Sequence, residues 1–194
     1  MKRKSFLLQL VLAASMLFST VTYAAEKAVV RDIPIGGSGQ MEMVGTVEPT
    51  LLSVTMPTFV PFNISNSLST QNKVVSPRIP VKNNSNVPVS VDVAYTAVDL
   101  SKLENATWSD NGTVGPNQIA IGLKQEEEKD VMPTDLSQTR WLKDNQTQNM
   151  NVMLLDINQE GAMYVVGTLG ARVSENAAFS VTPTFVVSRT SGEN

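Results

Sequence analysis

The 194-residue sequence contains no cysteine and no histidine. Without cysteine the chain can form neither a disulfide framework nor a thiol nucleophile, so its core must be held together by burial alone. Without histidine it lacks the commonest general base and every Ser-His or Cys-His catalytic arrangement. The two absences together remove nearly all zinc, copper and haem chemistry. We therefore expect a protein that is not an enzyme and that uses no cofactor or metal.

Aromatic residues and positive charge are also scarce. Aromatics make up 6% of the chain, and 15 Lys and Arg face 18 Asp and Glu, for a net charge of −3. An acidic chain without a basic, aromatic-rich stripe repels phosphate backbones, so we expect no nucleic-acid partner. A glycosidase needs only two carboxylates, but no spacing in this sequence selects such a pair.

The first 24 residues have the three-part layout of a secretory signal peptide. Three basic residues at 2–4 precede an apolar stretch over 6–18, and small residues follow. This layout predicts cleavage between Ala24 and Ala25. Because the apolar stretch is too short for a comfortable membrane span, an uncleaved anchor is the lesser alternative. We expect a secreted protein, extracellular or at the cell surface, with no membrane span after cleavage and a mature net charge of −6, since −3 minus the three leader charges is −6.

Apolar and polar residues alternate along most of the remaining chain, which is typical of strands with one buried face. The clearest example is 87–95, whose odd positions are all large and apolar. The turn-forming residues 83–86 precede it, so with residues 79–82 it is predicted to form a β-hairpin with a four-residue loop. A second hairpin loop is predicted at 158–161. Further strands are expected over 119–123, 152–157, 163–169 and 179–187.

About nine short strands with few helices predict an antiparallel β-sandwich, with a closed barrel as the alternative. One or two short helices are expected. The first is a helical turn over 101–107. The second is a short helix over 134–145, which Thr134 or Asp135 would cap and whose Trp141 would cover one end of the sheet. The charged run 126–130 is typical of a solvated loop, with a cation site as the weaker interpretation. We expect the domain to cover residues 40–190, before a disordered tail at 191–194.

The segment 25–39, which follows the leader, gives the most specific indication of a function. Residues 28–35 form a short apolar strand, and the glycine-rich tether 36–39 follows. Such a strand can be donated to a neighbouring subunit, completing the edge of its sheet, and head-to-tail repetition produces a filament. The alternative is that this segment is the first strand of its own sheet. The residues that would fill a neighbour's groove are Val29, Val30, Ile33 and Ile35.

Three other patterns in the sequence bear on function. Trp108 and Trp141 are candidate ligand contacts because indole rings stack on sugars, although buried or capping tryptophans are more usual. The tetrapeptide Pro-Thr-Phe-Val occurs at 57–60 and again at 183–186, which is too few copies to define a repeat. Five Asn-x-Ser/Thr sequons matter only in a host that glycosylates exported proteins. They are Asn63, Asn83, Asn105, Asn111 and Asn145.

The strand and turn residues of 40–95 resemble secreted surface proteins of Gram-positive bacteria. The resemblance is carried by Leu-Ser-Val-Thr-Met-Pro at 52–57, Phe-Asn-Ile at 62–64, Val-Ser-Pro at 75–77 and Val-Lys-Asn-Asn-Ser-Asn-Val-Pro-Val at 81–89. These runs are similar to the TasA/camelysin group of biofilm-matrix fibre proteins and to proteins that travel with WxL-type cell-surface domains. The resemblance implies an extracellular β-sandwich that assembles or adheres, with donated N-terminal strands as in TasA-like fibres.

Two features of such surface proteins are missing. Trp141-Leu142 lacks the spacer of a Trp-x-Leu motif, and the tail 189–194 holds no LPxTG sorting signal. The leading hypothesis is an exported, non-enzymatic structural or adhesive subunit of a cell surface or biofilm matrix, which associates with itself or with other surface or matrix proteins. The alternative is a soluble extracellular module that binds a polysaccharide through Trp108 or Trp141.

Overall fold

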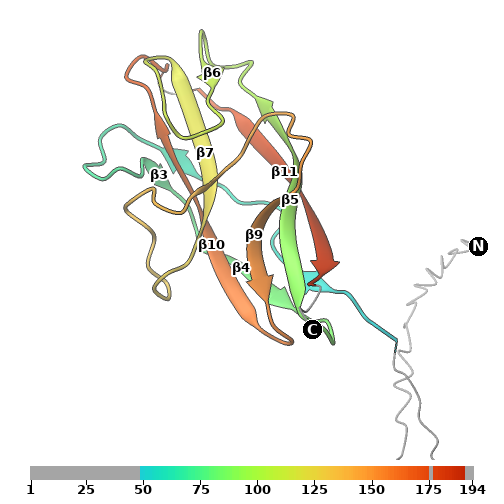
Figure 1. The fold of residues 1–194 in the computed structure, drawn as a ribbon. Coiled ribbons are helices and arrows are strands. Elements are labelled where there is room, and N and C mark those ends of the chain that lie inside the picture. The colour runs from blue at the N-terminus through green and yellow to red at the C-terminus, as the bar shows by residue number, and fades with distance from the viewer. Residues whose placement is uncertain (1–48, 175–176, 191–194) are drawn as a thin grey trace, which may run out of the picture. The chain divides into compact units, whose positions relative to one another are not determined.

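The computed structural model describes residues 49–174 and 177–190, which form eleven strands and no helix (Figure 1). This part of the chain confirms the all-β prediction. The predicted leader, the segment 25–39 and the tail 191–194 lie outside the described residues. No helix in the described ranges is long and apolar enough to cross a membrane. The predicted site residues that lie outside them are Ala24, Ala25, Val29, Val30, Ile33 and Ile35.

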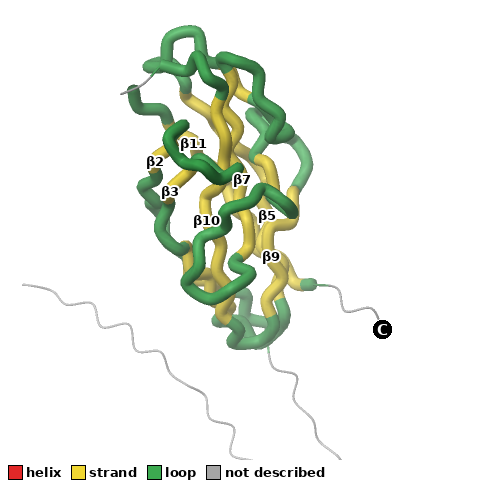
Figure 2. Tube along the Cα trace, turned by 90° about the vertical axis from the view of Figure 1, so that its left-hand side faces the viewer, coloured by secondary structure: helices red, strands yellow, loops and turns green. Residues whose placement is uncertain are grey.

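The strands form two larger sheets and one separate pair. The larger sheet has the order β1-β4-β10-β7-β6, with β8 also paired to β7, and the second has the order β11-β5-β9. All pairs are antiparallel except β6 with β7. In Figure 2 the long strands run side by side and loops close both ends. The bounds are β1 Val54–Thr55, β2 Asn63–Ile64, β3 Val74–Val75, β4 Ile79–Asn83, β5 Val89–Asp99, β6 Thr107–Trp108, β7 Gln118–Gln125, β8 Arg140–Trp141, β9 Met150–Leu155, β10 Glu160–Leu169 and β11 Ser180–Arg189.

One apolar core joins the two larger sheets. β5 contributes Val89, Val91 and Val93, which are 0% exposed, as the alternation of 87–95 predicts. From the facing sheet, Ile119 of β7 and Met163 of β10 belong to the same cluster. Each side chain of this size stabilises the fold by about 1.5–3 kcal/mol when it is fully buried. The core therefore forms by burial alone, as the absence of cysteine requires.

Both predicted hairpins are wrong, because the strands on either side of each loop belong to different sheets. β4 pairs with β1 and β10, whereas β5 pairs with β9 and β11. Similarly, β9 pairs with β5, whereas β10 pairs with β4 and β7. Residues 83–86 and 158–161 therefore carry the chain from one sheet to the other. A turn pattern predicts a change of direction, but it does not select the strand that becomes the partner.

A buried asparagine fixes the first of these crossings. Asn83 is 0% exposed, and the two hydrogens of its Nδ2 are shared among the backbone oxygens of Val87, Leu155 and Asp156 at 3.0, 3.3 and 2.9 Å. Its Oδ1 accepts a hydrogen bond from the N–H of Ser85 at 2.8 Å. These bonds tie the end of β4 to the end of β9, which lie in different sheets. They also occupy the nitrogen that a glycan would need, so this sequon is closed in the folded domain.

A β-bulge turns Tyr95 away from the core, against the prediction. The register of β5 against β11 skips Ala94, and a one-residue shift moves the following side chains to the opposite face. Thr96 takes the buried position, and Tyr95 is 41% exposed. The Tyr95 hydroxyl instead donates a hydrogen bond to Asn145 Oδ1 at 2.6 Å.

The two predicted short helices do not form in these described segments. Residues 101–107 form turns and the start of β6, and residues 134–145 form turns and β8. Asp135 Oδ1 does accept a hydrogen bond from the N–H of Ser137 at 2.8 Å, as a capping residue would. The next residue, Gln138, has a φ of 56°, and this left-handed backbone stops a right-handed helix from continuing.

Candidate functional site

The strand β11 has a free edge. One edge of this ten-residue strand pairs with β5, and no strand in residues 49–174 or 177–190 pairs with the other. In Figure 1, β11 lies at the margin of its sheet, with β5 and β9 on its far side. A free edge presents unpaired N–H and C=O groups, and proteins usually protect it with lysine, proline or a covering loop. β11 has one proline, Pro183, and no lysine, so most of this edge can accept another strand.

An apolar groove of about 600 Å³ runs beside this edge. One wall is β11 with the preceding Phe179, and the other wall is the segment 56–62, of which no residue is in a strand until β2 begins at Asn63. Core side chains of the larger sheet lie at its base and remain buried, so the groove reaches down to the core. These side chains are Ile79, Ile121, Leu123, Leu142, Met163 and Val165.

The inner face of β11 is only half-buried. Phe185 and Val187 lie directly opposite Val93 and Val91 of β5, and residues opposite each other in a pair point to the same face of the sheet. The two β5 valines are 0% exposed, whereas Phe185 and Val187 are partly exposed. The described residues thus cover the middle of this sheet and leave the apolar side of its β11 margin open.

Two phenylalanines close one end of the groove. The rings of Phe62 and Phe179 meet edge to face, with centroids 5.7 Å apart and planes at 76°, a favourable aromatic geometry. Because Phe179 precedes β11 and Phe62 precedes β2, this contact joins the two walls where β11 begins. At the other end of the strand, the N–H of Thr190 donates to the backbone oxygen of Pro88 at 3.2 Å, which continues the pairing with β5.

The repeated tetrapeptide Pro-Thr-Phe-Val lies on both walls of the groove. The copy at 57–60 belongs to the first wall and the copy at 183–186 to β11, and the proline and phenylalanine of each copy line the groove. Phe59, in the first copy, is 81% exposed. The sequence patterns did not predict the groove. The repeated tetrapeptide is the sequence feature that occurs on both of its walls.

The two tryptophans predicted to contact a ligand pack against the protein itself. Trp108, in β6, is partly buried, and its Nε1–H donates to the backbone oxygen of Leu142 at 3.0 Å. Trp141, in β8, is also partly buried, and a Cβ placed on Gly112 would fall 2.2 Å from its ring. Gly112 has a φ of 79°, so this turn requires glycine for both conformation and space. Neither ring lines the groove beside β11.

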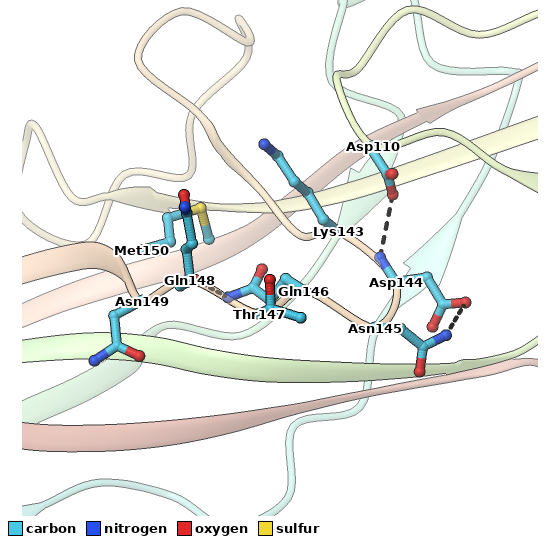
Figure 3. A pocket seen from close by; sticks show the side chains of 9 residues that line it. All are labelled: Asp110, Lys143, Asp144, Asn145, Gln146, Thr147, Gln148, Asn149 and Met150. Carbon is cyan, nitrogen blue, oxygen red and sulfur yellow. Dashed lines mark hydrogen bonds between the residues drawn. The ribbon is translucent and has the colours of Figure 1, made fainter.

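A polar hollow of about 430 Å³ lies between Asp110 and the loop 143–150 (Figure 3). The N–H of Asp144 donates to Asp110 Oδ1 at 3.1 Å, and Asn145 Nδ2 donates to Asp144 Oδ2 at 2.9 Å. These carboxylates and Gln146, whose Nε2 donates to the backbone oxygen of Val93 at 2.6 Å, hold the loop in place. Thr147, Gln148 and Asn149 are exposed. Neither tryptophan lines this hollow. In the described ranges no three acidic residues are grouped so that they could hold a metal ion.

The charged run 126–130 is held down by ion pairs. Arg78 binds Glu126 through two contacts, Nε to Oε1 at 2.7 Å and Nη2 to Oε2 at 2.8 Å. The N–H of Asp130 also donates to Glu126 Oε1 at 2.8 Å. The hydrogen bonds from Arg78 hold the pKa of Glu126 down to about 2, against a partial opposing effect of burial. This geometry explains the run as a structural feature of the loop.

A buried lysine of β7, Lys124, binds two carboxylates that follow β7 along the chain, those of Glu127 and Asp135. Lys124 is 1% exposed, and its Nζ lies 2.8 Å from Asp135 Oδ1 and 3.1 Å from Glu127 Oε1. Burial lowers the pKa of Lys124, but the two carboxylates more than offset it, so that its pKa is raised. The hydrogen bond from Lys124 in turn holds the pKa of Asp135 well below its usual range. Lys124 and Asp135 are therefore both charged at neutral pH.

The Arg78–Glu126 pair predicts a loss of stability in acid. The pKa of Glu126 falls from 4.5 to about 2 on folding, so the unfolded chain binds this proton first as the pH falls. The stabilisation is fully present above pH 4.5 and is lost progressively towards about pH 2. Urea unfolding across this range measures the decline. Glu126→Gln should lessen it and Glu128→Gln, at an exposed position of the same loop, should not; equal declines would contradict this assignment.

Comparison with known proteins found no match to the chain among family models, curated proteins or solved structures. The candidate site is thus defined by its own geometry. It consists of the free edge of β11, the apolar groove beside that edge, and the phenylalanine pair that closes one end of the groove.

Proposed function

We propose that this protein is an exported, non-enzymatic structural or adhesive subunit of a cell surface or extracellular matrix. The observation that supports this most directly is the free edge of β11, a ten-residue strand whose apolar inner face is half-buried. Another strand can add to such an edge through main-chain hydrogen bonds and bury alternate side chains beside it. The predicted leader at 1–24 supports export, and the likeness of 40–95 to biofilm-fibre proteins favours assembly.

In this proposal the two larger sheets form a β-sandwich that lacks one strand at the β11 margin. The strand that completes it is donated by the N-terminal segment 28–35 of a neighbour, on the tether 36–39. Its residues Ile33 and Ile35 are separated by one residue, so an extended backbone turns both to the same side. Subunits that complete one another head to tail assemble into an open filament unless their rotation closes a ring.

Aspartate substitutions at Ile33 and Ile35 test the donated strand. We expect the double variant of mature residues 25–194 to lose assembly, because an unpaired carboxylate is expensive to bury in an apolar groove. The monomer should keep its fold, because both positions lie outside the described domain. Sedimentation measures assembly and circular dichroism measures the fold. The matched control, Ile33→Leu with Ile35→Leu, should still assemble. Continued assembly of the aspartate variant would contradict the proposal.

A soluble module that binds a polysaccharide is the second candidate, and the polar hollow at 143–150 favours it. Gln148 and Asn149 line this hollow and offer the amide groups that sugars bind. A glycan array separates the two candidates. Specific binding that is lost in Asn149→Ala, with the fold kept, would favour the ligand-binding module over the structural subunit.

A further inference from the structure

We infer that the groove between β11 and residues 56–62 is the acceptor site, and that it takes residues 28–35 from a second copy of this chain. The added strand would pair with the free edge of β11 and place Ile33 and Ile35 on the groove side. This inference rests on the proposed function and adds to it the location of the contact and the face of the strand that is buried.

The groove has the dimensions of a short extended segment. Its β11 wall runs from Phe179 to Phe185, which corresponds to about 23 Å at ~3.3 Å per residue. The eight residues of 28–35 would extend over about 26 Å on the same scale, enough to fill it. The groove is continuous with the core, so apolar side chains inserted there would meet the buried side chains of β7 and β10 as well as β11.

The chemistry of the two surfaces matches. The β11 residues that alternate towards the groove are Val181, Pro183 and Phe185, and an added strand would place its alternate residues beside them. Phe59, on the opposite wall, is 81% exposed. A large aromatic left open at the rim of an apolar groove is typical of a surface that another chain covers.

The sequence outside the described domain narrows the choice of occupant. The tail after β11 is Ser-Gly-Glu-Asn, which has no apolar side chain to insert, whereas 28–35 has four large ones. Thirteen residues, 36–48, separate this segment from Pro49, and four of them are glycine. Fully extended, they span about 43 Å at ~3.3 Å per residue, which allows the segment to reach beyond its own copy. A copy that filled its own groove would have no free edge to accept a neighbour, so assembly requires a second copy.

Disulfide mapping tests this acceptor site, because the chain has no cysteine of its own. Mature chains carrying Ile33→Cys are mixed, under assembling and mildly oxidising conditions, with mature chains carrying one acceptor cysteine. Val181→Cys and Phe185→Cys place the thiol on the groove side of β11. Thr184→Cys and Val186→Cys are matched controls at exposed positions of the same strand that do not line the groove. Peptide mass spectrometry identifies which cysteines are joined.

The expected result is a mixed disulfide from Ile33→Cys to Val181→Cys or Phe185→Cys, about tenfold above either control, because bond geometry tolerates only adjacent side chains. Equal or greater linkage to the exposed control positions would overturn the inference. Filaments that form without any groove-side linkage would place the acceptor elsewhere, while the proposed function would stand. Loss of both filaments and linkage, with every variant folded, would overturn both.

Discussion

Asn83→Ala is expected to lower the free energy of unfolding by about 3 kcal/mol, since the two hydrogens of its Nδ2 and its Oδ1 make three full hydrogen bonds worth ~1 kcal/mol each. The substitution would leave the backbone oxygens of Val87, Leu155 and Asp156 without this donor, and the bond to Leu155 is buried. It would also open a cavity at a position that is 0% exposed. Domains of this size have total stabilities of about 5–15 kcal/mol, so the loss would be a large fraction of the whole.

The neighbouring residue provides the control. Asn84 is exposed, and its Nδ2 donates to Thr55 Oγ1 at 2.8 Å. Asn84→Ala should therefore cost about 0.5–1 kcal/mol, the net value of one exposed hydrogen bond. Urea unfolding of both variants gives the comparison. Similar losses for Asn83→Ala and Asn84→Ala would contradict the view that a buried side chain holds the crossing between the two sheets.

Strand positions could be predicted from the sequence because one-sided burial leaves a period of two. The inner valines of β5 and the alternation in β11 follow that pattern. β7 and β10 are instead buried over six consecutive residues each, 119–124 and 162–167. Strand partners could not be predicted, because the bonds that select them join distant residues. Asn83, for example, bonds to residues 72 and 73 positions further along the chain, and its turn-forming character gives no sign of them. The bulge at Ala94 also leaves no mark on the apolar pattern.

The candidate site was only partly predictable. The donated segment 28–35 was proposed from its apolar residues and its tether, and it stays a prediction. The acceptor groove was not found, because one of its walls, residues 56–62, has no regular strand pairing and the other wall lies more than 100 residues later. Trp108 and Trp141 were considered from residue type alone, whereas packing places both rings against the protein. The tetrapeptide at 57–60 and 183–186 was the one visible link between the walls.

We expect removal of the donated segment to have the largest effect on assembly. Of the chain outside the described domain and after the predicted leader, 28–35 holds four large aliphatic residues, two of them isoleucine, and precedes the glycine-rich tether. A chain that starts at Gly39 keeps β11 and its groove as an acceptor but has lost the strand that would be donated. Because each head-to-tail contact needs both parts, assembly should be abolished, whereas the fold of residues 49–190 should persist.

Negative-stain electron microscopy of residues 25–194 beside the chain that starts at Gly39 tests this most directly. The account predicts filaments from the longer chain and only monomers from the shorter one. Filaments from both would show that the donated segment is not the connection between subunits. If both chains stay monomeric at high concentration, the N-terminal segment is an ordinary strand or arm, the structural role is contradicted, and ligand binding at the polar hollow becomes the function to test.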